Sequence, residues 1–387
     1  MFELAERVAT LPPYLFKEID EKKRDLERQG ADIIDLGVGD PDLPTPSKII
    51  EAMRSAVRDP ATHHYPAYSG SGDFKEAIAE WYGERFSVVL DPDTEVLSLI
   101  GAKEGIAHIH LAFLNPGDLA LIPTPGYPVY NIGTLFADGV SYSLPLVREN
   151  GFLPELDSIP EETARKAKIL WLNYPNNPTT GVANREFFEA VVAFAHKYEV
   201  MVCNDLTYSE IAFDGYRPPS LLEIEGAKEV AVEFHSLSKS FNMTGWRIGF
   251  AVGNKEAVTG LGTVKSNLDS GVFQAIQRAG VVALRESQDS IREIQKIYAT
   301  RRDIVVNGLR DAGFVLDAPK ATFYLWVPIP QPYTSTSLAT KLLTEAGVVV
   351  TPGNGFGFPG EGYVRLALTQ DESRLLEAAE RIKQVGL

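Results

Sequence analysis

A single cysteine, Cys203, is present among the 387 residues. One thiol cannot build an internal disulfide framework, so we expect the protein in a reducing compartment, the cytoplasm. The sequence also lacks a continuous apolar stretch of the about 18 residues that a membrane span needs. Its first residues carry acids where a signal peptide would have an apolar core. We therefore expect no membrane partner.

Basic residues are outnumbered by acidic ones. The chain has 37 Lys and Arg against 52 Asp and Glu, which gives a formal net charge of −15 without any basic block. Nucleic acids and anionic membranes attract positive surfaces, so neither is expected as a partner. The six histidines include two close pairs, 63–64 and 108 with 110, but such neighbouring rings do not face one ion. No metal site is expected.

What is present is an ordinary globular composition, 44% hydrophobic and 23% charged, over a length that suits one large domain and a smaller one. Short apolar runs alternate with amphipathic helical patterns between about residues 95 and 255. This alternation predicts an α/β fold in three layers, a mostly parallel sheet with helices on both faces. The expected strands are Val96–Ile100, Leu119–Ile122, Ser141–Pro145, Ile169–Asn173, Val200–Asn204, Val230–Phe234 and Ile248–Val252. The expected helices are Lys103–Leu114, Val129–Ala137, Arg185–Tyr198 and Lys255–Val264.

The remaining segments predict three regions: an N-terminal arm at 1–45, a large domain at 46–285 and a small C-terminal domain at 286–387, to which the arm contributes. The arm ends in a charged helix, Lys17–Gln29, and a long helix, Ser287–Leu309, links the two domains. The small domain is expected to contain strands at 322–327, 348–351 and 363–367 and helices at 335–346 and 372–385.

The segment around Lys239 carries the strongest chemical signal. It follows the expected strand Val230–Phe234, and an amine at such a position attacks an aldehyde only when desolvation or nearby cations lower its pKa. Ser236, Ser238 and Arg247 offer two hydroxyl donors and a guanidinium fork, which suit a phosphate dianion. A lysine beside a phosphate cradle suggests pyridoxal phosphate, although a lone lysine in a polar loop is more often a surface residue.

Other polar residues follow neighbouring strands and should meet at the same sheet edge, where α/β proteins bind ligands. Asp205 comes directly after an apolar strand and could keep a pyridine nitrogen protonated, or could instead cap a helix. Asn177 and Tyr208 could donate to a ring phenolate, and Tyr127 could stack on the ring. The free N–H groups that begin the helix at Ala102 would add an anion site.

Two further residues point to a carboxylate ligand. Arg365 lies on a strand between apolar residues, and a buried arginine needs either a ligand carboxylate or a structural ion pair. Gly39 lies in a glycine-rich turn whose bare backbone N–H groups can approach a carboxylate, unless the turn is only a tight connection.

Taken together, these motifs resemble the fold-type I, class I and II aminotransferases that use pyridoxal phosphate. The resemblance covers nearly the whole chain from Leu36 onward. It rests on Asn177-Pro178-Thr179, Asp205-Leu206-Thr207-Tyr208, Ser236-Leu237-Ser238-Lys239 with Arg247, and Arg365. One departure is visible: the family usually has a glycine after the Asn-Pro-Thr triplet, and here Thr180 intervenes before Gly181.

The resemblance implies a role for each residue. Lys239 forms the covalent link to the cofactor and then shuttles a proton between the substrate and the cofactor. Asp205 pairs with the pyridine nitrogen, Tyr208 and Asn177 bond to the ring oxygen, and Tyr127 stacks on the ring. The phosphate is held by Ala102, Lys103, Ser236, Ser238 and Arg247, with Tyr65 reaching it across a homodimer interface, and the α-carboxylate is held by Arg365 and Gly39.

Within that family the chain is most similar to the LL-diaminopimelate aminotransferases, through the segments at 14–19, 36–40, 101–103 and 265–271. The resemblance makes Tyr14, Lys103 and Asn267 substrate contacts, with Tyr14 and Asn267 supplied by the partner subunit. Some members carry an acid near Tyr68 that would pair with the distal ammonium of the substrate, and the substitute for it in this chain is not visible in the sequence.

We therefore expect a homodimeric aminotransferase that works by a ping-pong scheme on amino acids and 2-oxo acids and transfers the amino group between LL-diaminopimelate and 2-oxoglutarate. A broad alanine, aspartate or aromatic aminotransferase is an alternative. An aspartate enzyme should supply an arginine for the distal carboxylate, and residues 265–271 contain none. A pyridoxal-phosphate-dependent C–S lyase is a further alternative. A cofactor-sensing transcription regulator would need a basic helix-turn-helix, for which the short arm leaves no room.

Overall fold

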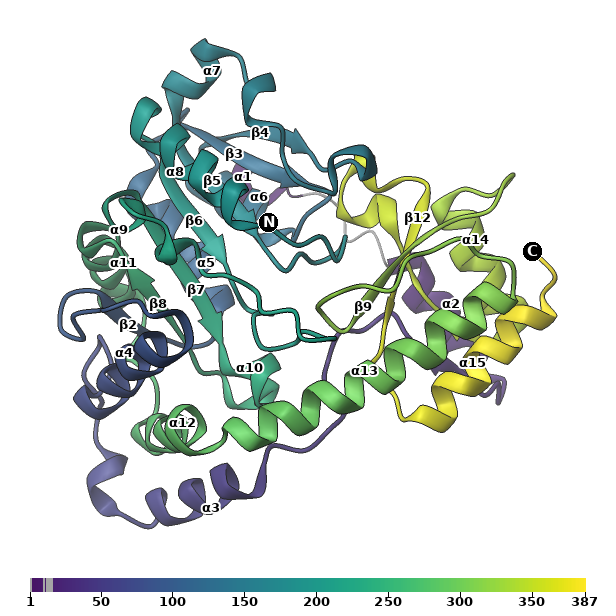
Figure 1. Cartoon of the computed structure of the whole chain (residues 1–387), viewed down its shortest axis with the longest axis horizontal. Helices are drawn as coiled ribbons and strands as arrows, with labels where there is room; N and C mark the ends of the chain where they lie inside the picture. The colour runs from purple at the N-terminus through teal and green to yellow at the C-terminus, as the bar shows by residue number, and fades with distance from the viewer. Residues whose placement is uncertain (1, 10, 12–16) are drawn as a thin grey trace.

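The computed structural model describes residues 2–9, 11 and 17–387 (Figure 1). Its largest sheet has seven strands in the order β2-β8-β7-β6-β5-β3-β4, and β8 alone runs antiparallel to its neighbours. The predicted mostly parallel sheet is confirmed. The strands are β2 (Val96–Leu99), β3 (Leu119–Thr124), β4 (Val140–Pro145), β5 (Ala167–Asn173), β6 (Met201–Asp205), β7 (Ala231–Ser236) and β8 (Gly249–Gly253).

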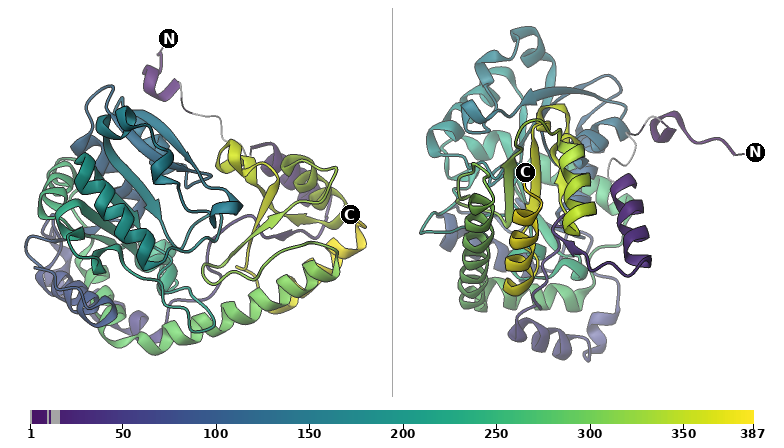
Figure 2. Two further views of the ribbon diagram at one scale, coloured as in Figure 1. Left: turned by 45° about the horizontal axis from the view of Figure 1, so that its top comes forward. Right: turned by 90° about the vertical axis from the view of Figure 1, so that its right-hand side faces the viewer.

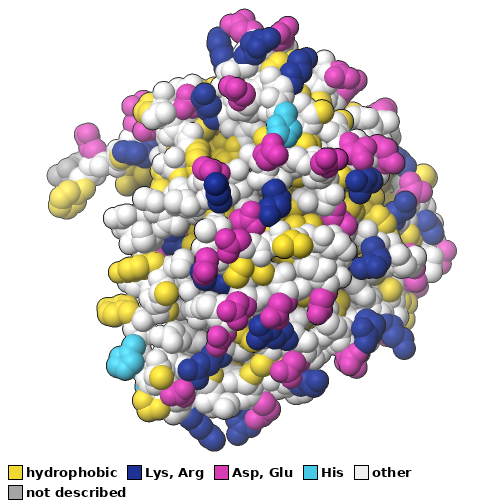
Figure 3. Space-filling model, turned by 60° about the vertical axis from the view of Figure 1, so that its left-hand side comes forward, with side chains coloured by type: hydrophobic (Ala, Val, Ile, Leu, Met, Phe, Trp, Pro, Cys, Tyr) yellow, Lys and Arg dark blue, Asp and Glu magenta, His cyan; other side chains and the backbone are white. Residues whose placement is uncertain are grey.

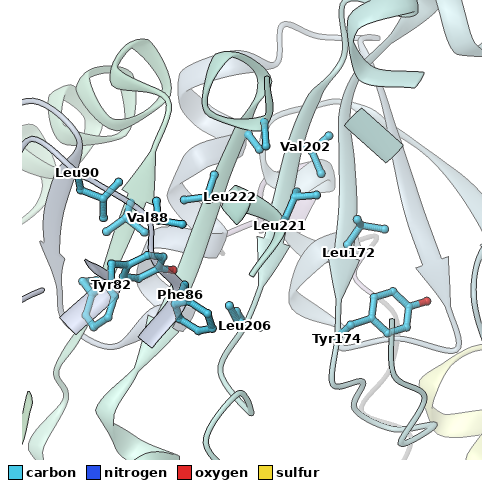
Figure 4. Close-up of a cluster of buried hydrophobic side chains, with 14 of the residues drawn as sticks. Tyr82, Phe86, Val88, Leu90, Leu172, Tyr174, Val202, Leu206, Leu221 and Leu222 are labelled. Atoms are coloured by element: carbon cyan, nitrogen blue, oxygen red, sulfur yellow. The ribbon is translucent and has the colours of Figure 1, made fainter. Parts of the chain in front are cut away.

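Strands β5, β6, β7 and β8 are buried on both faces of the sheet, because their successive side chains point to opposite sides and most of them are apolar, whereas the edge strand β4 is largely exposed. On β5, Leu170 and Leu172 pack into one core, while Ile169 and Trp171 pack into the core on the other face. Figure 4 shows part of the first of these cores, in which Tyr82 lies beside Phe86 and Leu172 lies beside Tyr174 further along the sheet. The central sheet is therefore the middle layer of three.

Helices cover each face. The core on one face includes residues of α5 (Ala102–Phe113), α6 (Val129–Phe136) and α11 (Lys255–Leu268). The core on the other face includes residues of α3 (Ser47–Ala56), α4 (Gly72–Phe86), α8 (Arg185–Tyr198) and α12 (Gln274–Glu286). Short helices complete this part of the chain: α1 (Glu6–Ala9), α7 (Glu161–Lys166), α9 (Ala227–Val230) and α10 (Leu237–Ser240).

Helices α3 and α12, which pack against each other, were not predicted from the sequence. Few of their buried side chains are large and apolar. The buried residues of α12 are mainly small ones such as Ala275, Ala279 and Gly280, and α3 buries only Ile49 and Ala56. Small residues allow close helix contact but contribute little to an apolar periodicity.

A smaller set of strands lies beside the main sheet. Strands β9 (Tyr324–Pro328), β12 (Tyr363–Ala367) and β11 (Thr351–Pro352) form an antiparallel sheet, and β1 (Ile34–Asp35) pairs with β10 (Val348–Val349) in parallel. The prediction of one strand over 348–351 was wrong, because β10 and β11 belong to different sheets. Helices α2 (Lys17–Arg28), α13 (Gln288–Asp311), α14 (Ser335–Lys341), a π-helical turn (Leu342–Ala346) and α15 (Glu372–Gln384) complete this part.

N-terminal and C-terminal residues share one core in this smaller part. Ile19, Ile34 and Leu36 pack with residues from the C-terminal strands and helices. The predicted contribution of the arm to the small part agrees with this packing, and the domain boundaries at 45 and 285 remain a prediction. Figure 2 shows the two parts from two further sides, with α13 running along both.

Helix α13 connects the two parts. Ile291 packs into the core beside the large sheet, and Ile294 and Tyr298 pack into the core of the small part. The change from one core to the other therefore takes place within a single helical turn. The 24 residues of α13 span about 36 Å at 1.5 Å per residue.

The surface mixes charges of both signs. On the face shown in Figure 3, Lys and Arg side chains alternate with Asp and Glu side chains. Within residues 2–9, 11 and 17–387, no helix is both long and apolar enough to cross a bilayer.

Truncation of a central core residue tests the three-layer packing. Phe234 on β7 is fully buried in the core beneath α5 and α11, so we expect Phe234→Ala to lower the free energy of unfolding by about 3–5 kcal/mol. The measurement is the midpoint of urea unfolding followed by circular dichroism. Val89→Ala, at a side chain that is 84% exposed, should change the stability by less than about 0.5 kcal/mol. Similar midpoints for the two variants would contradict the assignment.

Candidate active site

A cavity of about 490 Å³ lies at the carboxyl edge of the large sheet, where the small part covers it. Twelve of the fifteen residues predicted from the sequence line it together. Because parallel strands end at the same edge, residues far apart in the chain converge there. The twelve are Gly39, Ala102, Lys103, Tyr127, Asn177, Asp205, Tyr208, Ser236, Ser238, Lys239, Arg247 and Arg365.

Arg247 precedes strand β8, yet it lies at the carboxyl edge of the sheet because β8 runs in the opposite direction to the parallel strands. Strand β8 runs antiparallel to β7, with Ser236 opposite Gly249, so the connection between them lies wholly at the carboxyl edge of β7. That connection carries Lys239 on α10 and Arg247 just before β8. The two cations therefore enter the cavity from one short segment.

The amine of Lys239 is held in a desolvated place. Its Nζ donates to the carbonyl oxygen of Gly39 at 2.8 Å and lies 5.5 Å from the ring centre of Phe323. Burial, opposed by the Asp40 carboxylate and aided by Arg247 and Arg365, lowers the pKa of Lys239 from its ordinary 10.5 to about 8. A large share of this amine is therefore neutral and nucleophilic near pH 8.

The carboxylate of Asp205 is buried at the end of β6, only 5% exposed. Its Oδ2 accepts from the Tyr130 hydroxyl at 2.9 Å, and its Oδ1 accepts from the Thr207 hydroxyl at 2.6 Å. Burial raises the pKa of Asp205, and these hydrogen bonds partly offset the rise. Within the described chain no cation pairs with this carboxylate, so it is free to pair with a protonated ligand nitrogen.

At another wall of the cavity the chain forms an anion cradle. Gly101 has φ +77°, and a Cβ built there would lie 2.1 Å from Nη2 of Arg247, so glycine lets the guanidinium approach the start of α5. The backbone N–H groups of Ala102 and Lys103 belong to the unpaired first turn of that helix. Nη1 of Arg247 donates to the Ser238 hydroxyl at 3.3 Å, and the hydroxyl of Ser236 lies on the same wall. This donor set suits a phosphate-like dianion.

Arg365 on β12 approaches the cavity from the small part. Its Nη1 donates to Oδ1 of Asn177 at 2.7 Å, and its Nη2 donates to the carbonyl oxygen of Gly37 at 2.8 Å. The guanidinium lies 4.2 Å from the ring centre of Tyr324 and 4.7 Å from that of Phe356. Its Nε is buried without a hydrogen-bond partner. No acid of the described residues pairs with Arg365, so the structural ion pair considered from the sequence is not found there.

The loop after β5 fixes the side chain of Asn177. Oδ1 of Asn173 accepts from the backbone N–H of Asn177 at 2.8 Å, and Oδ1 of Asn176 accepts from Thr179. The additional residue Thr180 takes a left-handed conformation with φ +60°, and Asn177 still lines the cavity. Since Oδ1 of Asn177 accepts from Arg365, its Nδ2 remains as the donor for a ligand oxygen.

Two tyrosines line the cavity between these groups. Burial raises the pKa of Tyr127 to about 12, and Tyr208 is buried with a raised pKa as well. The Tyr208 hydroxyl lies 3.3 Å from the Tyr324 hydroxyl. Both phenols therefore stay protonated near neutral pH and can donate a hydrogen bond.

Three predicted residues do not line the cavity. Tyr65 is 87% exposed, and Asn267 at the end of α11 is exposed and donates from Nδ2 to the carbonyl oxygen of Thr263 at 2.8 Å. Tyr14 lies outside the described residues. The segment of Asn267 is anchored by the fully buried Lys265, whose Nζ pairs with Asp269 at 2.9 Å.

Several residues of the site were missed in the sequence. Thr207 could have been found, because an aspartate side chain commonly accepts from the backbone N–H two residues on, as Asp205 does from Thr207. Tyr130 gave no such signal, since it faces Asp205 from the separate helix α6. Tyr324, Phe356 and Asp40 also line the cavity.

The residues present fit one kind of ligand. A dianionic group suits the cradle around Arg247, a protonated ring nitrogen suits Asp205, and an aldehyde carbon between them would meet the amine of Lys239. A carboxylate suits Arg365. Within the part of the chain that the structure describes, no three His, Cys, Asp or Glu side chains gather as a metal site requires.

Known proteins of one family match the chain over nearly its whole length. The family model described as aminotransferase class I and II matches residues 31–382. The chain is 59% identical over 385 residues to an LL-diaminopimelate aminotransferase of Syntrophobacter fumaroxidans, covering 100% of this chain and 99% of that one. It is 55% identical over 387 residues, with full coverage of both chains, to the enzyme of that name from Aquifex aeolicus.

Solved structures share the fold. Substrate-bound BacF from Bacillus subtilis is 38% identical and superposes with a TM-score of 0.95, covering 100% of this chain and 98% of that one. A mutant aspartate aminotransferase of Thermus thermophilus is 30% identical with a TM-score of 0.93 and full coverage of both chains.

The lowered pKa of Lys239 can be measured directly. In the cofactor-free protein, we expect the rate of acylation of Lys239 to rise with pH and to level off above about pH 8, where an ordinary lysine is less than about one per cent neutral. Peptide mass spectrometry after brief treatment with acetic anhydride gives the rate at each pH. Exposed lysines of the same digest serve as reference, and a profile for Lys239 that matches theirs would refute the shift.

Proposed function

This chain belongs to the class I and II aminotransferase family, and we propose that it transfers the amino group of LL-diaminopimelate to a 2-oxo acid such as 2-oxoglutarate, with pyridoxal phosphate as its cofactor. The observation that carries the proposal is the desolvated amine of Lys239 in a cavity that also holds Asp205, the cradle of Arg247 and the guanidinium of Arg365. The relatives from Syntrophobacter and Aquifex bear the name of this activity.

Bound pyridoxal phosphate draws electron density from the substrate α-carbon, which is the chemistry that amine transfer needs. Lys239 first provides a neutral amine for attachment of the cofactor aldehyde. The Nζ of Lys239 would take the proton from the α-carbon of the substrate and would later return a proton. A pKa near 8 suits both directions of this transfer at neutral pH.

Asp205 keeps a proton on the ring nitrogen of the cofactor. A buried carboxylate without a cationic partner stabilises a positive charge placed beside it, and the hydrogen bonds from Tyr130 and Thr207 favour its ionised form. Asn177 and Tyr208 donate to the ring oxygen, and Tyr127 offers an aromatic face to the ring. These assignments rest on which residues line the cavity and on the protonation of the two phenols.

The anionic ends of cofactor and substrate have separate binding groups. The N–H groups of Ala102 and Lys103, with Ser236, Ser238 and Arg247, hold the phosphate. Arg365 holds the α-carboxylate: its guanidinium is already oriented by Asn177 and Gly37, and its Nε is buried without a partner. The backbone N–H of Gly39 completes the carboxylate site.

Selection for a diamino dicarboxylate involves the far end of the cavity. Lys103 is exposed there and offers a cation for the distal carboxylate. Within the described residues, arginine enters the cavity only as Arg247 and Arg365, and the predicted roles of those two leave no arginine for the side chain of aspartate. This distribution favours LL-diaminopimelate over aspartate as the amino donor.

A second copy of the chain would complete the site. Tyr65 and Asn267 are exposed outside the cavity of their own chain, yet both resemble residues that contact cofactor or substrate in the family. Exposed side chains of this kind can act only in a neighbouring cavity. We therefore propose a homodimer in which Tyr65 reaches the phosphate and Asn267 and Tyr14 reach the substrate of the partner subunit.

The proposed activity follows a ping-pong scheme, so each half can be observed alone. We expect LL-diaminopimelate and glutamate to bleach the visible absorption of the purified protein loaded with pyridoxal phosphate. Alanine, aspartate and phenylalanine should react at least about tenfold more slowly, because their side chains are too short or too apolar to pair with the distal cation of Lys103. Stopped-flow absorbance gives the second-order rate constant for each donor.

The outcomes separate the alternatives. Fast bleaching by phenylalanine or alanine with none by LL-diaminopimelate would leave a broad aminotransferase. Release of pyruvate and ammonia from a Cβ-substituted amino acid would indicate a lyase. Lys239→Ala should retain no donor-dependent bleaching, and a wild-type protein that stays colourless after loading would refute the role of Lys239.

Removal of one hydrogen bond to Asp205 should weaken the cofactor site. Tyr130→Phe leaves the ring stacked on Trp171 at 4.7 Å but removes the donor to Oδ2, so the pKa of Asp205 rises. We expect the acidic limb of the pH–rate profile to move to higher pH and the dissociation constant of the cofactor to increase about tenfold. Tyr142→Phe, on the outer strand β4, should leave both unchanged. An unaltered profile for Tyr130→Phe would show that this bond does not support the carboxylate.

A further inference from the structure

The cavity contains a carboxylate for which the proposed function has not yet provided a partner. Four cationic side chains line it, those of Lys103, Lys239, Arg247 and Arg365. The carboxylates that line it are those of Asp205 and Asp40. Asp205 is buried and accepts hydrogen bonds from Tyr130 and Thr207. Asp40 is exposed and makes no hydrogen bond or ion pair with any described residue.

The backbone that leads to Asp40 is held by hydrogen bonds, whereas the side chain of Asp40 forms none with the described residues. The carbonyl oxygen of Gly37 accepts from Nη2 of Arg365 at 2.8 Å, and that of Val38 accepts from the hydroxyl of Thr369 at 2.8 Å. The carbonyl oxygen of Gly39 accepts from Lys239 at 2.8 Å. A Cβ on Gly39 would lie 1.8 Å from the Tyr324 hydroxyl, so the turn packs closely against the small sheet.

Asp42, the next acid in this turn, has a structural role. Asp42 receives two hydrogen bonds from the buried Arg301, at 2.6 and 2.8 Å, and so ties the turn to α13. Asp40 has no such partner and faces the ligand cavity instead. An anchored turn that presents an unpaired carboxylate is pre-organised for a cation, because binding then costs little backbone entropy.

We propose that Asp40 receives the distal ammonium of the diamino substrate and thereby selects it over donors that lack this group. The inference rests on the proposed function. LL-diaminopimelate carries two carboxylates and two ammonium groups, and the α-carboxylate is assigned to Arg365, the distal carboxylate to Lys103 and the α-amine to the cofactor. The distal ammonium of the substrate then remains without an assigned partner, and so does the carboxylate of Asp40.

Asp40 could instead act on Lys239, and that role would have measurably different consequences from recognition of the ammonium. Its negative charge also acts on Lys239, so Asp40 could serve every donor alike by tuning that amine. Recognition of the distal ammonium changes the apparent affinity for one class of donor. Tuning of Lys239 would change the limiting rate with all donors and the pH profile of the amine.

The test compares two donors that differ in one group. 2-Aminopimelate has the chain length and both carboxylates of LL-diaminopimelate but lacks the distal ammonium. For the loaded wild-type protein and for Asp40→Asn, the second-order rate constant of bleaching is measured with each. We expect the ratio of LL-diaminopimelate to 2-aminopimelate to fall about 10- to 100-fold in the variant, as for loss of a charged hydrogen-bond partner. The loss should appear in the apparent dissociation constant.

Control variants keep the result interpretable. Asp40→Glu retains the charge and should recover part of the ratio, while Asp157→Asn, at an exposed carboxylate outside the cavity, should leave it as in the wild type. Acylation of Lys239 in the cofactor-free variants reports on the tuning of the amine without any turnover.

Three outcomes would overturn the proposal. A ratio for Asp40→Asn within about threefold of the wild type refutes recognition of the ammonium. An equal loss with both donors, together with a shifted acylation profile, assigns Asp40 to Lys239 instead. A wild-type protein that reacts with glutamate but not with LL-diaminopimelate refutes the proposed function and, with it, this role of Asp40.

Discussion

A buried carboxylate without a cation is the constraint on which the site depends. Desolvation makes the ionised form of Asp205 costly, and the protein compensates only in part, with hydroxyl donors from Tyr130 and Thr207. In the same cavity, burial makes the charged form of Lys239 costly as well. Burial thus disfavours the charged form that each group takes in water. A ligand with a protonated nitrogen would stabilise the charged Asp205, and its aldehyde would react with the neutral Lys239.

The topology of the large sheet makes this pairing possible. Parallel strands β5, β6 and β7 deliver Asn177, Asp205 and Lys239 to a single edge, each just beyond a strand end. The reversed strand β8 adds Arg247 from the opposite chain direction. The small part then covers the edge with Arg365, so the groups that would hold cofactor and substrate come from both parts of the chain.

The sequence predicted the convergence well, because strand ends in a parallel sheet share an edge whatever their order. It also located the chemical residues, since Lys239 and Asp205 follow apolar runs directly. The hydroxyl of Tyr130 was not predictable, because it reaches Asp205 from the side of a helix and no local pattern records that contact. The split between β10 and β11 was missed for a similar reason: one apolar run through Val350 serves two sheets, and only tertiary pairing shows where it divides.

The passage of α13 from one core to the other has a mechanical consequence. Ile291 is embedded beside the large sheet, and Ile294 is embedded one turn later in the small part. Any rotation of the small part against the large sheet must therefore pivot near that turn, with the rest of the helix acting as a lever of about 28 Å. Arg365 lies in the small part and Asn177 beside the large sheet, so the 2.7 Å hydrogen bond between them would lengthen or break in such a rotation.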